Sequence, residues 1–252
     1  MKIHDGDPAV PPQSPNEATT HGSEGPLPVK VREAIEYLRA GKDAHLELLA
    51  RILDADEGKF FHVDFVVIAA MNRSMALIDG FTLLVEHKNA LSAVPLIRMQ
   101  IDNVIRLYAC WLVREPPVVA EALLADQPLN KIKSRTGDKL TDKYLYEAAS
   151  KHYPWIPEVY RQTSGFVHLS GRHIFAPITE LDDSTRRMTT SIGGGREWKE
   201  QEMLESVSAF IDATKCLLHL CASWLQTKEQ GQMSPEDRAK LLGIPVPEEF
   251  RK

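Results

Sequence analysis

The stretch Met203–Trp224, MLESVSAFIDATKCLLHLCASW, carries a long, mostly apolar stripe. Its stripe residues follow one another at alternating intervals of four and three positions, which is the spacing of one face of an α-helix. They are Met203, Val207, Phe210, Thr214, Leu217, Cys221 and Trp224. A stripe of this kind packs along a neighbouring helix. We therefore expect a long helix over Glu197–Glu229, inside a bundle of helices.

Helical patterns also fill most of the chain before this stretch. Three are long, and three shorter ones lie between them and the Met203–Trp224 stripe. The ranges are Val29–Leu53, Phe60–His87, Asn89–Arg114, Val118–Ala125, Lys139–Lys151 and a segment opened by Pro157. Helices that each carry one apolar face bury that face by packing side by side. We expect one mainly α domain, built as an antiparallel helical bundle.

The periodicity changes after Gly171. Ile174–Ile178 and Arg187–Ile192 are short and contain β-branched residues, and the acidic turn Glu180–Ser184 lies between them. This arrangement predicts a small β-hairpin. The expected fold class is therefore mainly α, an antiparallel helical bundle with a small β-hairpin insertion.

The two ends of the chain differ from its middle in composition. Residues 1–28 are rich in Pro, Gly, Ser, Thr and Asp, with almost nothing to bury, and we expect a disordered tail. Residues 29–229 form the bundle domain. In residues 230–252, Ser234 and Pro235 open a short capped helix that Gly243 ends, followed by a Pro-rich tail.

Composition limits the class of protein. Hydrophobic residues make up 43% of the chain and charged residues 26%, the balance of a soluble globular protein. A net charge of −5 argues against broad wrapping of nucleic acid, although a local basic pocket is compatible with it. The longest apolar run, Phe65–Met71, is too short to span a bilayer, and the N-terminus does not resemble a signal peptide. We expect a cytoplasmic protein without membrane contact.

The segment Tyr160–His173, YRQTSGFVHLSGRH, brings basic, hydroxyl and imidazole side chains together. Arg161 and His168 are seven positions apart, so on one continuous helix they would share a face, with Ser164 between them. An arginine binds phosphate and a histidine exchanges protons near neutral pH. The spacing predicts a site for a phosphate-containing substrate on this helix.

Arg161 followed by His168 in a helical chain resembles the signature of the HEPN superfamily. The segment is most similar to bacterial HEPN-like proteins with a Tyr-Arg…Ser-Gly-x-Val-His-x-Ser core. The resemblance covers residues 160–173 in motif and about residues 60–225 in architecture. It implies a helical bundle, often dimeric, that in many members is a metal-independent endoribonuclease of toxin–antitoxin or phage-defence systems. Gln162 and Gly165 depart from the pattern of the active members.

The resemblance implies roles for individual residues. His168 would move protons during RNA cleavage and Arg161 would hold the scissile phosphate, with neither metal nor cofactor. Ser164 and Ser170 would add hydrogen bonds to the substrate, and Arg172 and His173 would extend the basic cluster. The alternative is that Arg161 and His168 pair with carboxylates and backbone carbonyls at a helix end.

Arg98, Asp102 and Arg106 recur every four residues across an apolar helix. Charges in such a place are costly unless they are paired. One interpretation is an internal ladder of ion pairs. The other is that Arg98 or Arg106 faces the Arg161/His168 pocket and binds phosphate.

Two functions remain open from the sequence. The first is a HEPN-like endoribonuclease of a defence or toxin system, with RNA as substrate and an antitoxin as partner. The second is a non-catalytic helical module for dimerisation or partner binding. Because the Met203–Trp224 stripe is long and apolar, we also expect a homodimer, with Arg161 and His168 near the interface.

Overall fold

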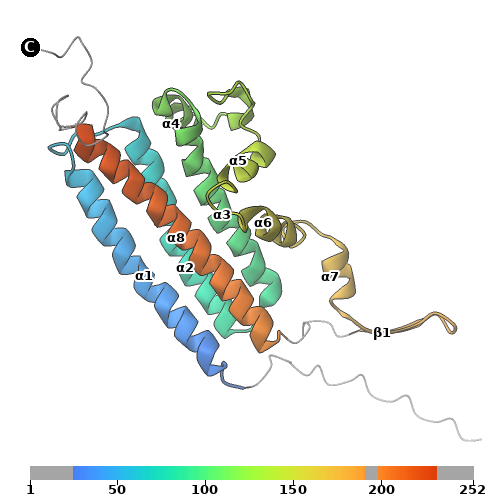
Figure 1. Cartoon of the computed structure of the whole chain (residues 1–252). Coiled ribbons are helices and arrows are strands. Elements are labelled where there is room, and N and C mark those ends of the chain that lie inside the picture. The colour runs from blue at the N-terminus through green and yellow to red at the C-terminus, as the bar shows by residue number, and fades with distance from the viewer. Residues whose placement is uncertain (1–24, 191–197, 232–252) are drawn as a thin grey trace, which may run out of the picture.

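Figure 1 shows the computed structural model, in which residues 25–190 and 198–231 are described. The tail expected over residues 1–28 and the helix and tail expected over residues 230–252 therefore lie almost wholly outside the described residues. Within the described part, the chain is mainly helical with one two-stranded antiparallel sheet, which confirms the expected fold class.

Four long helices form the bundle: α1 (Val29–Asp54), α2 (His62–Glu86), α3 (Ala90–Leu112) and α8 (Glu200–Gly231). Each packs on two neighbours, in the cyclic order α1, α2, α3, α8 (Figure 1). The helix boundaries lie within a few residues of those that the apolar periodicity predicts. Periodicity predicts them well because each apolar stripe has a partner helix to cover it.

The helices α1, α2 and α3 alternate in direction, and α8 is antiparallel to α2. Beside α1 and α3, however, α8 runs in the same direction (Figure 1). Lys228, near the end of α8, bonds the carbonyl of Ile52 near the end of α1. Phe210, in the first half of α8, stacks on Phe81 in the last part of α2, with ring centroids 4.4 Å apart.

The segment between α3 and α8 explains this direction. It contains α4 (Pro116–Leu124), the short 3-10 helix η1 (Leu129–Lys131), α5 (Asp142–Ala149) and α6 (Ile156–Ser164). The helices α4, α5 and α6 each pack on α3 (Figure 1). They bring the chain back toward the end of the bundle where α3 began, so α8 starts there and runs alongside α3.

After α6 the chain leaves the bundle as an arm, which we define as residues 166–190. The arm contains α7 (Gly171–Phe175), β1 (Ile178–Asp182) and β2 (Arg187–Thr190), with Ile178 opposite Thr190 and Asp182 opposite Arg187. The hairpin is confirmed, but its first strand begins only at Ile178. The expectation of a strand from residue 174 was wrong, because the backbone amides of His173 and Ile174 bond back to the carbonyl of Ser170 and begin a helix.

The turn of the hairpin is held by Asp182. Its carboxylate accepts bonds from the hydroxyls of Ser184 and Thr185, both at 2.6 Å, and from their backbone amides. The hydroxyl of Ser184 is the main reason that the pKa of Asp182 falls to about 2.

The Met203–Trp224 stripe is buried within its own chain. It therefore no longer supports the homodimer that we expected from it, although dimerisation itself stays a prediction. The cysteines Cys110, Cys216 and Cys221 are free and buried, and burial raises the pKa of each thiol to about 12. Among the described helices, α2 alone is long and apolar enough to span a membrane by length and composition, and in this fold it packs on α1 and α3.

Candidate functional site

The helix α6, which carries Arg161, is attached to α3 through Tyr160. The guanidinium of Arg98 lies over the ring of Tyr160, 3.5 Å from its centroid, and also donates to its hydroxyl. Burial is the largest influence on the pKa of Tyr160 and raises it, although the positive charge of Arg98 acts in the opposite sense. Arg98 thus positions α6 by a cation–π contact and a hydrogen bond.

Arg161 itself points into solvent and is paired with Glu158 one helical turn earlier. Its Nη2 lies 2.6 and 2.7 Å from the two carboxylate oxygens of Glu158. Gln162 donates to the same carboxylate at 2.6 Å. These bonds, with the Arg161 bond first, lower the pKa of Glu158. For Arg161, the alternative of a carboxylate pair at a helix end is what the structure contains.

His168 does not lie on the same helix as Arg161. The helix ends at Ser164, and residues 165–168 form a turn, so the expectation of one shared helical face was wrong. The hydroxyls of Thr163 and Ser164 bond back to the carbonyls four residues earlier, and Gly165 follows. Both features weaken the continuation of a helix. His168 is exposed and makes no hydrogen bond or ion pair with any described residue.

The remaining candidates of this segment lie at the base of the arm. The hydroxyl of Ser164 donates to the carbonyl of Tyr160, and that of Ser170 donates to the carbonyl of Gly165, both at 2.6 Å. His173 Nδ1 accepts the backbone amide of Ser170 at 3.4 Å. Arg172 lies in α7, and the position of its side chain is outside what the structure describes. Ser170 and His173 thus stabilise the start of α7.

Arg106 belongs to a ladder of ion pairs, as one of the two interpretations predicted. Asp102 accepts from Arg106 at 3.1 Å and from Arg73 of α2 at 3.1 Å, and Arg106 continues to Asp142 of α5 at 3.1 Å. Arg98 is outside this ladder and contacts Tyr160 instead. The ladder ties α2, α3 and α5 together, and neither arginine contacts Arg161 or His168 among the described residues.

A buried hydrogen-bond network crosses the middle of the bundle and continues into the ladder. At its centre, the amide of Gln100 donates to Ser74 at 2.6 Å and to Thr214 at 3.0 Å, and its oxygen accepts from Asn103. His45 Nε2 lies 2.9 Å from the Ser74 hydroxyl. These residues come from all four long helices. Every buried side-chain nitrogen or oxygen in the described ranges has a hydrogen-bond partner.

His45 and Ser74 resemble a base and a nucleophile in their separation only. Both are fully buried, so no substrate reaches them. His45 Nδ1 lies 2.8 Å from the carbonyl of Gly41 and must donate to it, so Nε2 accepts from Ser74. Burial lowers the pKa of His45 and keeps the ring neutral. The pair is a structural part of the bundle.

A second buried polar cluster closes one end of the bundle. The ammonium of Lys228 donates to the carbonyls of Ile52 and Lys59 and lies 3.2 Å from the carboxylate of Asp64. The other oxygen of Asp64 accepts the indole N–H of Trp224 at 2.7 Å. Lys228 and Asp64 are 1% and 0% exposed. The cluster joins the end of α1, the start of α2 and the end of α8.

The arm has the opposite character from these clusters, because its large apolar side chains face solvent. Leu169 is 86% exposed and Phe175 is 66% exposed. The others that are half exposed or more are Val167, Ile174, Leu181 and Met188. Neither α7 nor the hairpin packs extensively on another element, and in Figure 1 they extend away from the bundle. Apolar surface gathered on one segment in this way indicates an interaction site.

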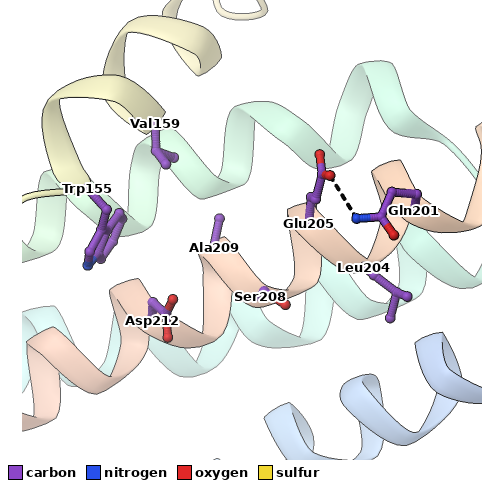
Figure 2. A pocket seen from close by; sticks show the side chains of 8 residues that line it. All are labelled: Trp155, Val159, Gln201, Leu204, Glu205, Ser208, Ala209 and Asp212. Atoms are coloured by element: carbon purple, nitrogen blue, oxygen red, sulfur yellow. Dashed lines mark hydrogen bonds between the residues drawn. The ribbon is translucent and has the colours of Figure 1, made fainter.

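A shallow groove lies between α6 and α8 on the surface of the bundle (Figure 2). Its apolar surface comes from Trp155, which directly precedes α6, from Val159 of α6, and from Leu204 and Ala209 of α8. Its polar rim comes from α8, and consists of Gln201, Glu205, Ser208 and Asp212. The rim is acidic, and Gln201 donates to Glu205 at 2.9 Å (Figure 2). We call this surface the α6–α8 groove.

The chain matched no protein-family model, no curated protein and no solved structure. The HEPN-like resemblance therefore stays a prediction from the sequence motif. Within the described ranges, no three His, Cys, Asp or Glu side chains are grouped so that they could hold a metal ion.

Proposed function

We propose that this protein is a non-catalytic helical interaction module, whose binding surface is the arm at residues 166–190. The single observation that carries the proposal is the set of large apolar side chains that the arm exposes, led by Leu169 and Phe175. An isolated two-stranded hairpin is marginally stable in water, so an arm of this kind gains most from packing on another surface.

The distribution of polar groups supports a binding role. The polar groups inside the bundle satisfy one another, and His45 and Ser74 have no access to substrate. On the surface, Arg161 is held by Glu158. A general acid or base must lie within hydrogen-bond reach of the proton that it transfers. The buried pair of His45 and Ser74 cannot reach a substrate, whereas the apolar side chains of the arm are open to a partner.

The arm can be tested in the setting where a partner is present. The elution volume of the tagged full chain in size-exclusion chromatography of a lysate of its source cells reports assembly with any protein. We expect the wild type to elute in an assembly larger than one chain, and Leu169→Glu/Phe175→Glu to elute as a single chain. Leu83→Glu is the matched control, because Leu83 is 53% exposed on α2 and lies outside the arm. Equal elution of wild type and arm variant would remove the proposal.

A second candidate function is the HEPN-like endoribonuclease. The observation that favours it is that both side chains are exposed, Arg161 at the end of α6 and His168 at the start of the arm, so a partner surface docked there would lie next to both. In that case His168→Ala and His168→Gln would lose RNA cleavage alike, because neither side chain transfers a proton near pH 7. Since His168 has no described partner, both variants should melt like the wild type. Unchanged cleavage in a folded His168→Ala protein would sink this assignment.

A further inference from the structure

We propose that the partner of the arm is a second copy of this chain, and that each arm docks in the α6–α8 groove of the other copy. The inference rests on the proposed function and names its partner. Three features of the described residues carry it: the position of the groove relative to the arm, the apolar character of both surfaces, and their charges.

The arm is connected at one end to α6, which also lines the groove. The helix α6 ends at Ser164 and leads directly into the arm, and α8 begins at Glu200 after it. The same α6 and α8 form the two walls of the groove. Each chain therefore carries the donor surface and the acceptor surface side by side. An exchange between two chains satisfies both surfaces at once and closes as a symmetric dimer.

The apolar parts of the two surfaces match in kind. The groove presents the half-buried side chains of Trp155, Val159 and Leu204. The arm presents Leu169 and Phe175, which have no apolar cover in the single chain. Aromatic and aliphatic side chains that leave water together at the centre of an interface supply most of its affinity.

The arginines of the arm and the rim of the groove carry opposite charges. The rim of the groove carries Glu205 and Asp212. The turn and second strand of the arm carry Arg186 and Arg187, which are exposed and form no ion pair with another described residue. The hairpin also carries the carboxylates of Glu180, Asp182 and Asp183, and the proposed docking turns the two arginines, rather than these carboxylates, toward the groove. Opposite charges around an apolar centre select the partner and its orientation.

Within one chain the arm does not occupy the groove. It leaves the C-terminal end of α6 and extends away from the bundle (Figure 1), whereas Trp155 directly precedes α6 and Val159 lies in its first half. A second copy brings an arm from outside, so the direction of departure is no obstacle. The arrangement is a reciprocal one, in which the same surface patch of each copy contacts the other.

The test is a pair of charge reversals in the full chain, measured by light scattering at tens of micromolar. One variant reverses the groove, Glu205→Arg/Asp212→Arg, and the other reverses the arm, Arg186→Glu/Arg187→Glu. In each variant alone, like charges meet at both contacts, and we expect the dissociation constant of the dimer to rise by about tenfold or more. In an equal mixture, each arm meets a groove of opposite charge, and dimers should form again.

The control is Glu33→Arg/Asp43→Arg, which changes the net charge by the same amount at exposed positions of α1, and should dimerise like the wild type. The proposal is overturned if the wild-type chain is a monomer, if either charge variant dimerises like the wild type, or if the mixture stays monomeric. A monomeric pure protein that still forms arm-dependent assemblies in its lysate would overturn the second copy as partner and leave the interaction module standing. If the assemblies in the lysate did not depend on the arm, both the second copy as partner and the interaction module would be overturned.

Discussion

The bundle and the arm differ in how far their side chains are covered and paired. In the bundle, even the polar groups that lie inside have partners, as the cluster around Lys228 and Asp64 and the network around Gln100 show. In the arm, large apolar groups such as Leu169 lie in water. The bundle therefore covers its apolar and polar side chains within a single chain, whereas the arm leaves large apolar side chains exposed.

The polar groups of the bundle also specify how its helices meet. A fully satisfied buried network has one arrangement in which every donor finds its acceptor, so it disfavours rotated or shifted packings. Gln100 of α3 reaches Ser74 of α2 and Thr214 of α8 only in this register. The arm has no comparable set of contacts to fix its place on the bundle.

The largest loss of stability is expected for a substitution at the end of the bundle that Lys228 and Asp64 hold together. Lys228→Met removes the ammonium that faces Asp64 and leaves a buried carboxylate short of its cation. We expect the free energy of unfolding to fall by about 3–5 kcal/mol, measured by urea denaturation. Adding Asp64→Asn should recover part of the loss. Lys215→Met, at an exposed lysine of α8, is the control and should change little. An unchanged midpoint for Lys228→Met would mean that the pair does not hold this end together.

The next largest loss of stability is expected in the middle of the bundle. Gln100→Leu keeps a similar volume but leaves Ser74, Thr214 and Asn103 without the partner that joins them, at a cost of about 1–3 kcal/mol. Gln226→Leu, on the exposed side of α8, is the control. Thermal unfolding followed by circular dichroism would compare the two. Equal melting temperatures would show that the network contributes no net stability.

The pH dependence of stability gives a second test of the buried network. Burial lowers the pKa of His45 below its ordinary value of 6.5, so the unfolded chain takes up a proton first as the pH falls. The contribution of His45 is therefore fully present above about pH 6.5 and is lost toward the lower folded pKa, by up to about 1.4 kcal/mol per pH unit. His45→Gln should flatten this slope between pH 7.5 and pH 5. His87→Gln, at an exposed histidine, should keep it.

The smallest effect on stability is expected in the arm. Leu169→Glu/Phe175→Glu should change the free energy of unfolding of the isolated chain by no more than about 0.5 kcal/mol, because both side chains are largely exposed. A dilute sample, below the range of association, would be used for the urea titration. A loss of several kcal/mol would show that the arm folds onto the bundle of its own chain.

Much of the bundle could be predicted from the sequence, because helix positions follow from apolar periodicity alone. Even the buried network left a signal: His45 lies seven positions after Leu38 and seven before Ile52, on their stripe, and Thr214 lies on the Met203–Trp224 stripe. A polar residue on an apolar stripe predicts a buried partner. The identity of that partner depends on the rotation of neighbouring helices, which a single sequence does not contain.

The candidate site was less predictable for a similar reason. The spacing of Arg161 and His168 places them on one face only if the helix continues, and Gly165 and the bonds of Thr163 and Ser164 end it. Arg98 shows the same limit, since its spacing placed it in a ladder, whereas the packing of α6 on α3 gave it Tyr160. The exposed arm was visible as a hairpin, but its lack of cover is a property of the packed structure.

The contrast between bundle and arm is tested most directly by hydrogen–deuterium exchange of the full chain, followed by mass spectrometry at two concentrations. In protein diluted below one micromolar, we expect slow exchange for the amides of α3 and fast exchange for those of residues 166–190. At tens of micromolar, the amides of the arm should become protected while those of α3 stay unchanged. Arm amides that are as protected as α3 in the dilute sample would show that the arm is held within its own chain and needs no partner.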